Sequence, residues 1–320
     1  MINQICYEVG ALLYSPALNE KVSNSVINGK FGTRYSLALC LEDTIADEHV
    51  DEAEEKLIKT LNEILKAKEY TRFYMPKVFI RVRNPEQLLR VHESIGEGLS
   101  IVTGYIIPKY SPVNMEKYNQ YIRKINEASA HVFYMMPTLE SSDIVDYRTR
   151  HETLISVKES IDSIKEYVLN VRVGGNDFSN AFSVRRHYDE TIYDILPIGQ
   201  LLADILTIFS REYIVSGPVW EFFSSDNNEW KEGLKREVAR DRLNGFVGKT
   251  VIHPKQIEIV NEAFKVSRKD YEDAKTILGW DEASGLQVGK STCGERMNEV
   301  KTHGNWALKT IMLAQIYGIS

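Results

Sequence analysis

Short runs of apolar, β-branched residues recur along the chain, and a helix-like segment separates each run from the next. We predict strands at 10–15, 36–42, 77–83, 102–108, 131–137, 168–174, 211–217 and 248–254. Between them, stretches such as DEAEEKLIKTLNEILKAKE carry apolar residues three or four positions apart, which is the spacing of an amphipathic helix. Eight strands alternating with helical connections favour an α/β fold, a (β/α)₈ TIM barrel. A doubly wound open sheet is the main alternative, because counting elements does not distinguish a closed sheet from an open one.

The chain is predicted to have two parts, a barrel domain at 1–278 and a C-terminal extension at 279–320. The extension starts with a loop-rich stretch and ends with ALKTIMLAQIYG, whose apolar spacing indicates a helix that must pack against something. Barrel enzymes keep water from reactive intermediates with mobile segments. We therefore predict that residues 285–305 lie over a barrel mouth, either their own or that of a neighbouring subunit. A solvated surface loop is the alternative.

Composition argues against several classes of protein. Hydrophobic residues make up 43% of the chain and charged residues 26%, as in an ordinary globular protein. The net charge of −6 argues against a protein that wraps nucleic acid, because such a protein needs a basic face. No apolar run is long enough to span a membrane, and MINQICYEVG lacks the pattern of a signal peptide. Cys6, Cys40 and Cys293 lie far apart, without the spacing of a disulfide framework, so we expect a cytoplasmic location.

Polar side chains stand where most of the predicted strands end. In a TIM barrel the carboxyl ends of all strands meet at one mouth, where the active site forms. These side chains therefore have to be considered together. They comprise four carboxylates, three cations and one histidine, namely Glu42, Asp43, Glu140, Asp177, Arg81, Arg83, Lys109 and His253. Their convergence on one mouth predicts a functional site there.

Arg81 and Arg83 are two positions apart on a predicted strand, so their side chains share one face of it. A guanidinium group aimed into a barrel is costly unless it meets an anion. That anion is either a substrate or an acidic side chain that braces the barrel, and both alternatives stay open for Arg83. We predict a functional role for Arg81, and we consider Arg83 and Lys109 as candidates for binding substrate.

The stretch VRVGGNDFSN places Asp177 just after a strand, as Glu140 follows the preceding strand. Mg²⁺ prefers oxygen ligands and often takes only one or two carboxylates, with water and substrate completing its coordination. Gly174 and Gly175 would let the backbone turn sharply and let a substrate approach closely. Asp177 could instead cap a helix or build a turn, since aspartate favours both.

Arg185 and Arg186 lie in SVRRHYDE, shortly after the same strand. Paired arginines bind carboxylate or phosphate groups well. We therefore consider both as secondary candidates for binding substrate. The alternative is a solvated basic turn.

Six segments, taken in order, resemble one known superfamily. LCLEDTI, FIRVRNP, GYIIPKY, MPTLES, VGGNDFSNAF and GFVGKTVIHPKQIEIVNEAF are similar to the citrate lyase β-subunit and HpcH/HpaI aldolase superfamily over residues 10 to 265. VGGNDFSNAFSVRRHYDETIYDI and SGPVWEFF resemble more narrowly its branch of C–C bond lyases of the TIM-barrel fold, which is associated with tellurite-resistance and stress-response gene clusters.

The resemblance implies a Mg²⁺-dependent enzyme that makes or breaks C–C bonds of a small oxo or hydroxy acid through an enolate. It would make Glu140 and Asp177 the metal ligands, Arg81 the residue that holds the enolate oxygen, and Glu42 and Asp43 the acidic pair near the reacting carbon. It also implies a homo-oligomer, a trimer or hexamer. We see no reason to infer a coenzyme A site.

One position departs from the family. Many relatives carry an acidic residue where this chain has Cys40, in CLED. Cys40 keeps open the alternative of a catalytically silent subunit or scaffold of a biosynthetic complex. Because a fold alone does not fix function, another transfer enzyme of the phosphoenolpyruvate type is a second alternative to the lyase.

Overall fold

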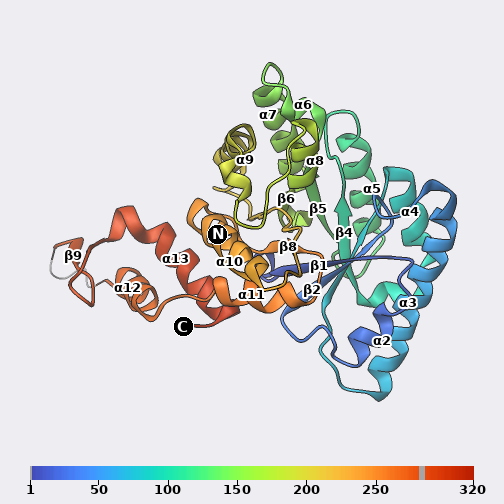
Figure 1. Ribbon diagram of the computed structural model, residues 1–320, viewed down its shortest axis with the longest axis horizontal. Coiled ribbons are helices and arrows are strands. Elements are labelled where there is room, and N and C mark those ends of the chain that lie inside the picture. Colours follow the sequence, from blue (N-terminus) through green and yellow to red (C-terminus); the bar gives the residue numbers. More distant parts are fainter. Residues whose placement is uncertain (1, 281–284) are drawn as a thin grey trace.

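The computed structural model describes residues 2–280 and 285–320 (Figure 1). All eight predicted strands are present and parallel, in the order β7-β6-β5-β4-β3-β2-β1-β8. A bridge between Gly217 and Lys249 joins β7 to β8, so the sheet closes on itself. The TIM barrel is thus confirmed and the open sheet is excluded. The strands are β1 (Ala11–Pro16), β2 (Tyr35–Cys40), β3 (Lys77–Arg81), β4 (Val102–Ile107), β5 (Tyr134–Leu139), β6 (Val171–Val173), β7 (Val215–Ser216) and β8 (Lys249–Val251).

Helices cover the outside of the barrel (Figure 1). The α-helices are α1 (Gln4–Tyr7), α2 (Val22–Ile27), α3 (Val50–Tyr70), α4 (Pro85–Ser94), α5 (Met115–Glu127), α6 (Ser142–Val145), α7 (Arg150–Asp162), α8 (Gly175–Ala181), α9 (Leu196–Phe209), α10 (Glu229–Asn244), α11 (Lys255–Ala263), α12 (Arg268–Leu278) and α13 (Val300–Tyr317). Short 3₁₀ turns occur at η1 (Asp47–His49), η2 (Gly96–Ile101), η3 (Lys165–Tyr167) and η4 (Ile192–Asp194).

Alternate residues of the strands face opposite sides of the barrel wall. One set fills an apolar layer inside the barrel, and its neighbours pack against the helices outside. The inner set includes Leu12, Ala38, Phe79, Ile106 and Met136. Two positions further along these strands, the same face carries Tyr14, Cys40, Arg81 and Thr138. The interior thus changes from apolar to largely polar toward the carboxyl ends of the strands.

The prolines at strand ends have two different roles. Asn84 caps α4 by accepting a hydrogen bond from the backbone N–H of Gln87 at 2.8 Å, and Pro85 is the first helical residue. Ser15 and Pro16 instead belong to β1, and the next helix begins only at Val22. A proline fits the last position of a strand where its missing N–H is not needed for pairing.

The C-terminal extension is held at the amino-terminal end of the barrel. Its helix α13 packs along α12 (Figure 1). The Tyr317 hydroxyl donates a hydrogen bond to the carbonyl of Tyr7 at 3.2 Å, and Lys309 Nζ donates to the carbonyl of Gly245 at 2.8 Å. Tyr7 precedes β1 and Gly245 precedes β8, so both contacts lie at the end of the barrel opposite the strand carboxyl termini.

The predicted position of residues 285–305 over their own barrel mouth is therefore wrong. Strands β9 (Val288–Lys290) and β10 (Met297–Glu299) form an antiparallel hairpin, which Arg296 ties to α12 through Asp270 at 2.6 Å and Asp273 at 2.7 Å. Figure 1 shows this hairpin at the left tip of the molecule, far from the barrel. Helices α12 and α13 pack at the amino-terminal end of the barrel, and the hairpin lies at the far end of this helix pair. A position over a neighbouring subunit's mouth stays a prediction.

The three cysteines are all free thiols, with Cys6 half-buried, Cys40 buried and Cys293 exposed. Among the residues described, no helix is both long and apolar enough to cross a membrane. The cytoplasmic location stays a prediction.

Candidate active site

A pocket of about 230 Å³ lies at the carboxyl ends of the strands. It receives side chains from β1, β3, β5, β6 and β8 and from the loops that follow them. Its lining residues are Tyr14, Asp43, Thr44, Arg81, Thr138, Glu140, Arg172, Val173, Gly174, Gly175, Asn176, Asp177, Val219, Thr250 and Ile252. Four of the residues predicted at strand ends, Asp43, Arg81, Glu140 and Asp177, thus share one pocket.

Arg81 is the centre of the charged cluster and is 8% exposed. Its Nη2 lies 2.9 Å from Glu42 Oε2, 3.2 Å from Asp43 Oδ2 and 3.3 Å from Glu140 Oε1. Burial would lower the pKa of Arg81, but the charges of Glu140 and Glu42 are among the causes that outweigh burial and raise it. The Arg81 Nε–H is buried and has no partner among the described residues. One donor of this group is therefore left for a ligand.

Lys109 contacts the same three acidic residues as Arg81. Its Nζ lies 2.7 Å from Glu42 Oε1 and 3.2 Å from Asp43 Oδ1, while its backbone N–H donates to Glu140 Oε1 at 3.0 Å. The residue has a φ of 47°, in the left-handed region that non-glycine residues rarely adopt. Strained backbone of this kind persists where the surrounding contacts determine it, and here it aims an N–H at a buried carboxylate.

The acidic residues differ in their affinity for protons. Burial raises the pKa of Glu42. Burial also acts on Asp43, but its hydrogen bond with Glu42 and the charges of Arg81 and Lys109 outweigh burial and lower its pKa. Neighbouring carboxyl groups whose pKa values are pushed apart are a common arrangement for a general acid and a general base.

Burial and, to a lesser degree, the charge of Asp177 raise the pKa of Glu140 to about 7, while Arg81 opposes the rise. The effect of Asp177 indicates that the two carboxylates act on each other across the pocket. A bound cation would offset both burial and this repulsion. Glu140 and Asp177 thus form a donor set that suits Mg²⁺. Among the described residues no group of three acidic, histidine or cysteine side chains could hold a metal, so water or substrate oxygens would complete the coordination.

Gly174 permits the close approach of Glu140. A Cβ atom at this position would lie 2.2 Å from Glu140 Oε2, which no side chain could tolerate without displacing the carboxylate. Asp177 lies in the first turn of α8, yet it accepts no capping hydrogen bond among the described residues. This geometry argues against the alternative of a capping or turn residue.

Six predicted residues are not part of the pocket lining: Glu42 and Lys109, which contact the charged cluster, Arg186, and Arg83, Arg185 and His253. Arg83 Nη1 donates to the carbonyl of Ile45 at 2.9 Å and to that of Leu41 at 3.4 Å, and its Nη2 pairs with Asp47. These contacts match the bracing alternative for Arg83. Arg185 is exposed and pairs with Glu221 at 3.2 Å. His253 stacks on Phe223 with ring centroids 4.9 Å apart.

Arg186 was predicted to bind substrate, and the structure corrects this expectation. Its side chain is fully buried, with Nε 3.0 Å from Glu237 Oε2. Lys249 Nζ completes the network at 2.9 Å from Glu237 Oε1 and 2.7 Å from Asp241 Oδ2, between the barrel wall and α10. Breaking such a network by removing one partner leaves an uncompensated charge, so it holds α10 on the barrel rather than serving a ligand.

Cys40 is buried beside Arg81, with its Sγ 4.0 Å from Arg81 Nη1. A carboxylate at this position would add a fourth anion to the cluster. The thiol instead leaves Arg81 less fully neutralised by the protein.

Sequence reasoning missed the residues at the base of the pocket, Tyr14, Thr138, Arg172 and Thr250. The sequence signal that could have identified them is the alternation of inward-facing and outward-facing side chains along each strand. Arg172 stands between two outward-facing valines in VRV, and this parity directs its side chain into the barrel.

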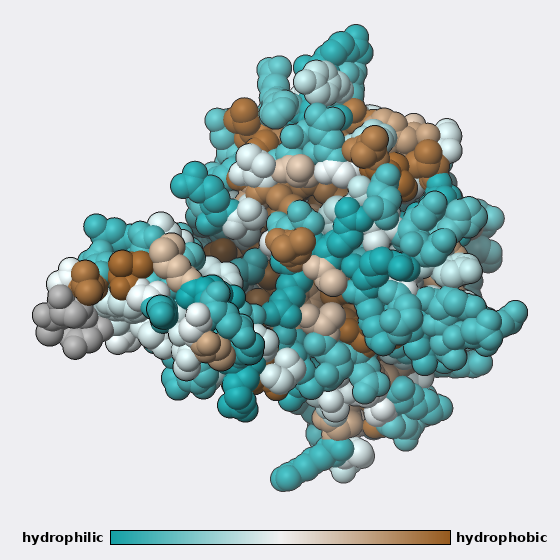
Figure 2. All heavy atoms as spheres, turned by 60° about the vertical axis from the view of Figure 1, so that its left-hand side comes forward, coloured by the Kyte–Doolittle hydropathy of each residue, from teal (hydrophilic) through white to brown (hydrophobic). Residues whose placement is uncertain are grey.

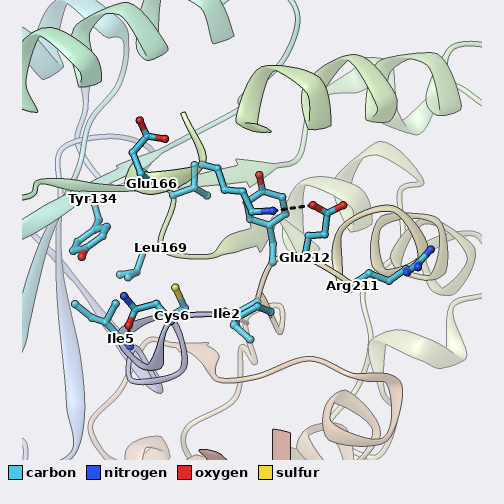
Figure 3. Close-up of a pocket in the computed structure, with 13 residues that line it drawn as sticks. Ile2, Ile5, Cys6, Tyr134, Glu166, Leu169, Arg211 and Glu212 are labelled. Atoms are coloured by element: carbon cyan, nitrogen blue, oxygen red, sulfur yellow. Dashed lines mark hydrogen bonds and ion pairs between the residues drawn. The ribbon is translucent and has the colours of Figure 1, made fainter. Parts of the chain in front are cut away.

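A larger pocket, of about 490 Å³, lies at the opposite end of the barrel (Figure 3). Its wall comes from α1 and from the residues at or just before the starts of β5, β6 and β7, with Cys6, Tyr134 and Leu169 among them. It contains an ion pair between Lys165 and Glu212 at 2.8 Å. The convergent carboxylates and the buried arginines belong to the smaller pocket, which we therefore take as the candidate active site.

Comparison with protein families gives one match that covers nearly the whole chain. The model of the C–C bond lyases of the TIM-barrel fold matches residues 3–319. Among curated proteins, citrate lyase subunit beta of Haemophilus influenzae is 43% identical over 56 residues, 18% of this chain and 19% of that protein. An L-malyl-CoA/β-methylmalyl-CoA lyase of Cereibacter sphaeroides is 40% identical over 70 residues, 22% of this chain and 20% of that protein. The chain thus matches about a fifth of the length of these relatives.

Solved structures share the fold at low sequence identity. The Mycobacterium tuberculosis CitE protein in complex with magnesium, acetoacetate and coenzyme A has a TM-score of 0.63 and 16% identity, covering 97% of this chain and 99% of that one. A citrate lyase from Burkholderia xenovorans has a TM-score of 0.71 and 13% identity, covering 98% and 93%.

Proposed function

The chain belongs to the C–C bond lyase family of the TIM-barrel fold, and from that premise we propose that it is a Mg²⁺-dependent carbon–carbon lyase or aldolase. Its substrate would be a small 2-oxo or hydroxy acid, cleaved through an enolate. Relatives in the comparison include two carbon–carbon lyases, and a structural neighbour was solved with magnesium and oxaloacetate. The pocket is smaller than the roughly 300–1,000 Å³ typical of drug-sized ligands, which suits a small acid.

The observation that carries the proposal is the position of Arg81 in this pocket. Its guanidinium group is buried and is held by three carboxylates, and its Nε–H has no partner among the residues that the structure describes. Cleavage of a C–C bond next to a carbonyl leaves an electron pair that becomes the enolate, with its charge on the former carbonyl oxygen. A fixed donor at that oxygen stabilises the charge as it forms.

The acidic pair next to Arg81 would move the protons. Asp43, whose pKa is lowered, would take the proton from the substrate hydroxyl, whose oxygen then becomes a carbonyl as the C–C bond breaks. Glu42, whose pKa is raised, would return a proton to the carbon of the enolate. Lys109 Nζ contacts both carboxylates and would hold them in position.

Glu140 and Asp177 would hold the metal. When bound, Mg²⁺ would supply a Lewis acid that polarises the substrate carbonyl. The hydrogen bond that the backbone N–H of Lys109 donates to Glu140 Oε1 at 3.0 Å would help to fix the orientation of this carboxylate.

The direct test is an assay of the purified protein with a panel of 2-oxo and hydroxy acids, with Mg²⁺ and with a chelator. We expect Mg²⁺-dependent release of a smaller oxo acid from at least one substrate. A protein that binds Mg²⁺ and these acids but cleaves none would favour the subunit or scaffold alternative. An association with tellurite-resistance or stress-response gene clusters stays a prediction.

We also propose that the chain forms a homo-oligomer through its extension. Figure 2 shows the extension as a lobe with hydrophobic side chains on its surface. Val288 is 43% exposed, Met297 55% and Trp306 37%, although large apolar side chains of this kind favour burial. We propose that a neighbouring subunit covers these side chains, in agreement with the oligomer that the family resemblance implies.

The Val288→Asp, Met297→Asp double variant is therefore expected to shift the protein from oligomer to monomer, because two charges would have to be buried at the contact. Light scattering after size exclusion measures the mass. Point variants are preferable to truncation after Leu278, since truncation also removes Tyr317, which packs on Phe264 in the core. An unchanged mass would place the contact elsewhere.

A further inference from the structure

Arg172 lies at the base of the candidate active site and is 2% exposed. Unlike Arg81, it has no carboxylate within ion-pair distance among the described residues. Its Nη2 donates to the Thr250 hydroxyl at 2.6 Å, while its Nη1 is buried and has no partner in the described part of the chain. A guanidinium group keeps its charge in proteins, so this residue carries a positive charge that the protein itself does not neutralise.

The surroundings of Arg172 increase the cost of that charge. Burial and the nearby charge of Arg81 both lower its pKa, while a hydrogen bond with Tyr14 opposes the shift. By comparison, Arg150, which is also buried, pairs with Asp204 at 3.1 Å and donates to the carbonyls of Ile144 and Val145. Burial of an unpaired charge is destabilising unless an anion meets it.

A second unpartnered group stands next to Arg172. Thr138 on β5 pairs in register with Arg172 on β6 and lines the same pocket. Its Oγ1 is buried and has no partner within residues 2–280 and 285–320. Buried polar atoms are nearly always hydrogen-bonded in native proteins. The unused N–H of Arg172 and the hydroxyl of Thr138 together suit the oxygens of a carboxylate.

From this geometry we propose that Arg172 and Thr138 bind a second carboxylate of the substrate at the base of the pocket, so that the substrate is a small dicarboxylate. The inference rests on the proposed function, in which Arg81, Glu140 and Asp177 hold the reacting oxo group. A carboxylate between Arg81 and Arg172 would offset the repulsion between the two cations. Arg172 is then a residue that determines specificity.

The test compares two stable ligands that differ by one carboxylate, malate and lactate, with Mg²⁺ present throughout. We expect the wild-type protein to bind malate about 10- to 100-fold more tightly than lactate, the range for a charged hydrogen bond. Arg172→Met should remove this preference by weakening the binding of malate far more than the binding of lactate. Calorimetry measures both affinities. Equal affinities in the wild type, or a preference that survives in the variant, would overturn the proposal.

Thermal unfolding without ligand supplies the second readout. Arg172→Met removes an unpaired buried charge, so its Tm should equal or exceed that of the wild type. The matched control Arg150→Met should lower the Tm, because it leaves Asp204 and two carbonyls without their partner. A fall in Tm for Arg172→Met as large as that for the control would make Arg172 structural.

The outcomes separate this inference from the proposed function. Malate selectivity that depends on Arg172, in a protein that cleaves no acid, would support the carboxylate site and contradict the lyase. Mg²⁺-dependent cleavage that is equal in the wild type and Arg172→Met would support the lyase and overturn the carboxylate site.

Discussion

Arg81→Lys is expected to lower turnover by about 10²- to 10³-fold, the cost of losing one oriented donor to a developing oxyanion. Lysine keeps the positive charge near Glu42, Asp43 and Glu140, so the acidic residues are still neutralised. It lacks the planar fork, however, and has no group at the position of Nε, the Arg81 donor that has no partner among the described residues. Steady-state kinetics on the cleaved acid measures the loss.

The stability of this variant decides how the loss is interpreted. Chemical denaturation should show a free energy of unfolding within about 1.5–3 kcal/mol of the wild type, the range for a hydrogen bond to a charged group. Arg83→Lys is the matched control, because Arg83 also follows β3 but its guanidinium group contacts Asp47 and two carbonyls outside the pocket. Its turnover should be nearly unchanged. Full turnover in Arg81→Lys would show that Arg81 is structural.

The fold was predictable because it depends on a pattern that repeats. Each strand is a short apolar run, and buried parallel strands have this composition on both faces. The same reasoning located Arg81, Glu140 and Asp177, since a TIM barrel brings all strand carboxyl ends to one mouth. Closure of the sheet does not follow from the local pattern, because it depends on the bridge between Gly217, just after β7, and Lys249 of β8.

The errors arose where a residue's partner is distant in the sequence. Arg186 resembled an exposed basic turn, but Glu237 lies 51 positions away and buries it. The apolar face of α13 indicated that it packs against something, and only the structure shows that α12 and the amino-terminal end of the barrel are its partners. The local sequence pattern thus predicts that a charged side chain or an apolar helix face needs a partner. Only the folded structure shows which residues provide it.

Glu140→Gln and Asp177→Asn are each expected to abolish Mg²⁺ binding and to lower turnover by at least about 10³-fold, because a bound metal contributes several kcal/mol to transition-state stabilisation. Each substitution preserves the shape of the side chain and removes only its charge. Mg²⁺ binding should depend on that charge, since Glu140 and Asp177 are the two protein ligands that we propose. Calorimetry with MgCl₂ alone measures metal binding without any assumption about the substrate.

Thermal unfolding then distinguishes loss of the metal from loss of the fold. Mg²⁺ should raise the Tm of the wild type, since a ligand that binds only the folded state stabilises it, and should leave the Tm of both variants unchanged. Without metal, Glu140→Gln should be no less stable than the wild type at pH 8, because burial raises the pKa of Glu140 to about 7 and its charged form is therefore costly above that pH. Asp189→Asn, in the exposed loop after α8, is the matched control and should retain both binding and turnover. Mg²⁺ that binds equally well to Glu140→Gln would place the metal elsewhere, and the pair of carboxylates would then have to act through protons alone.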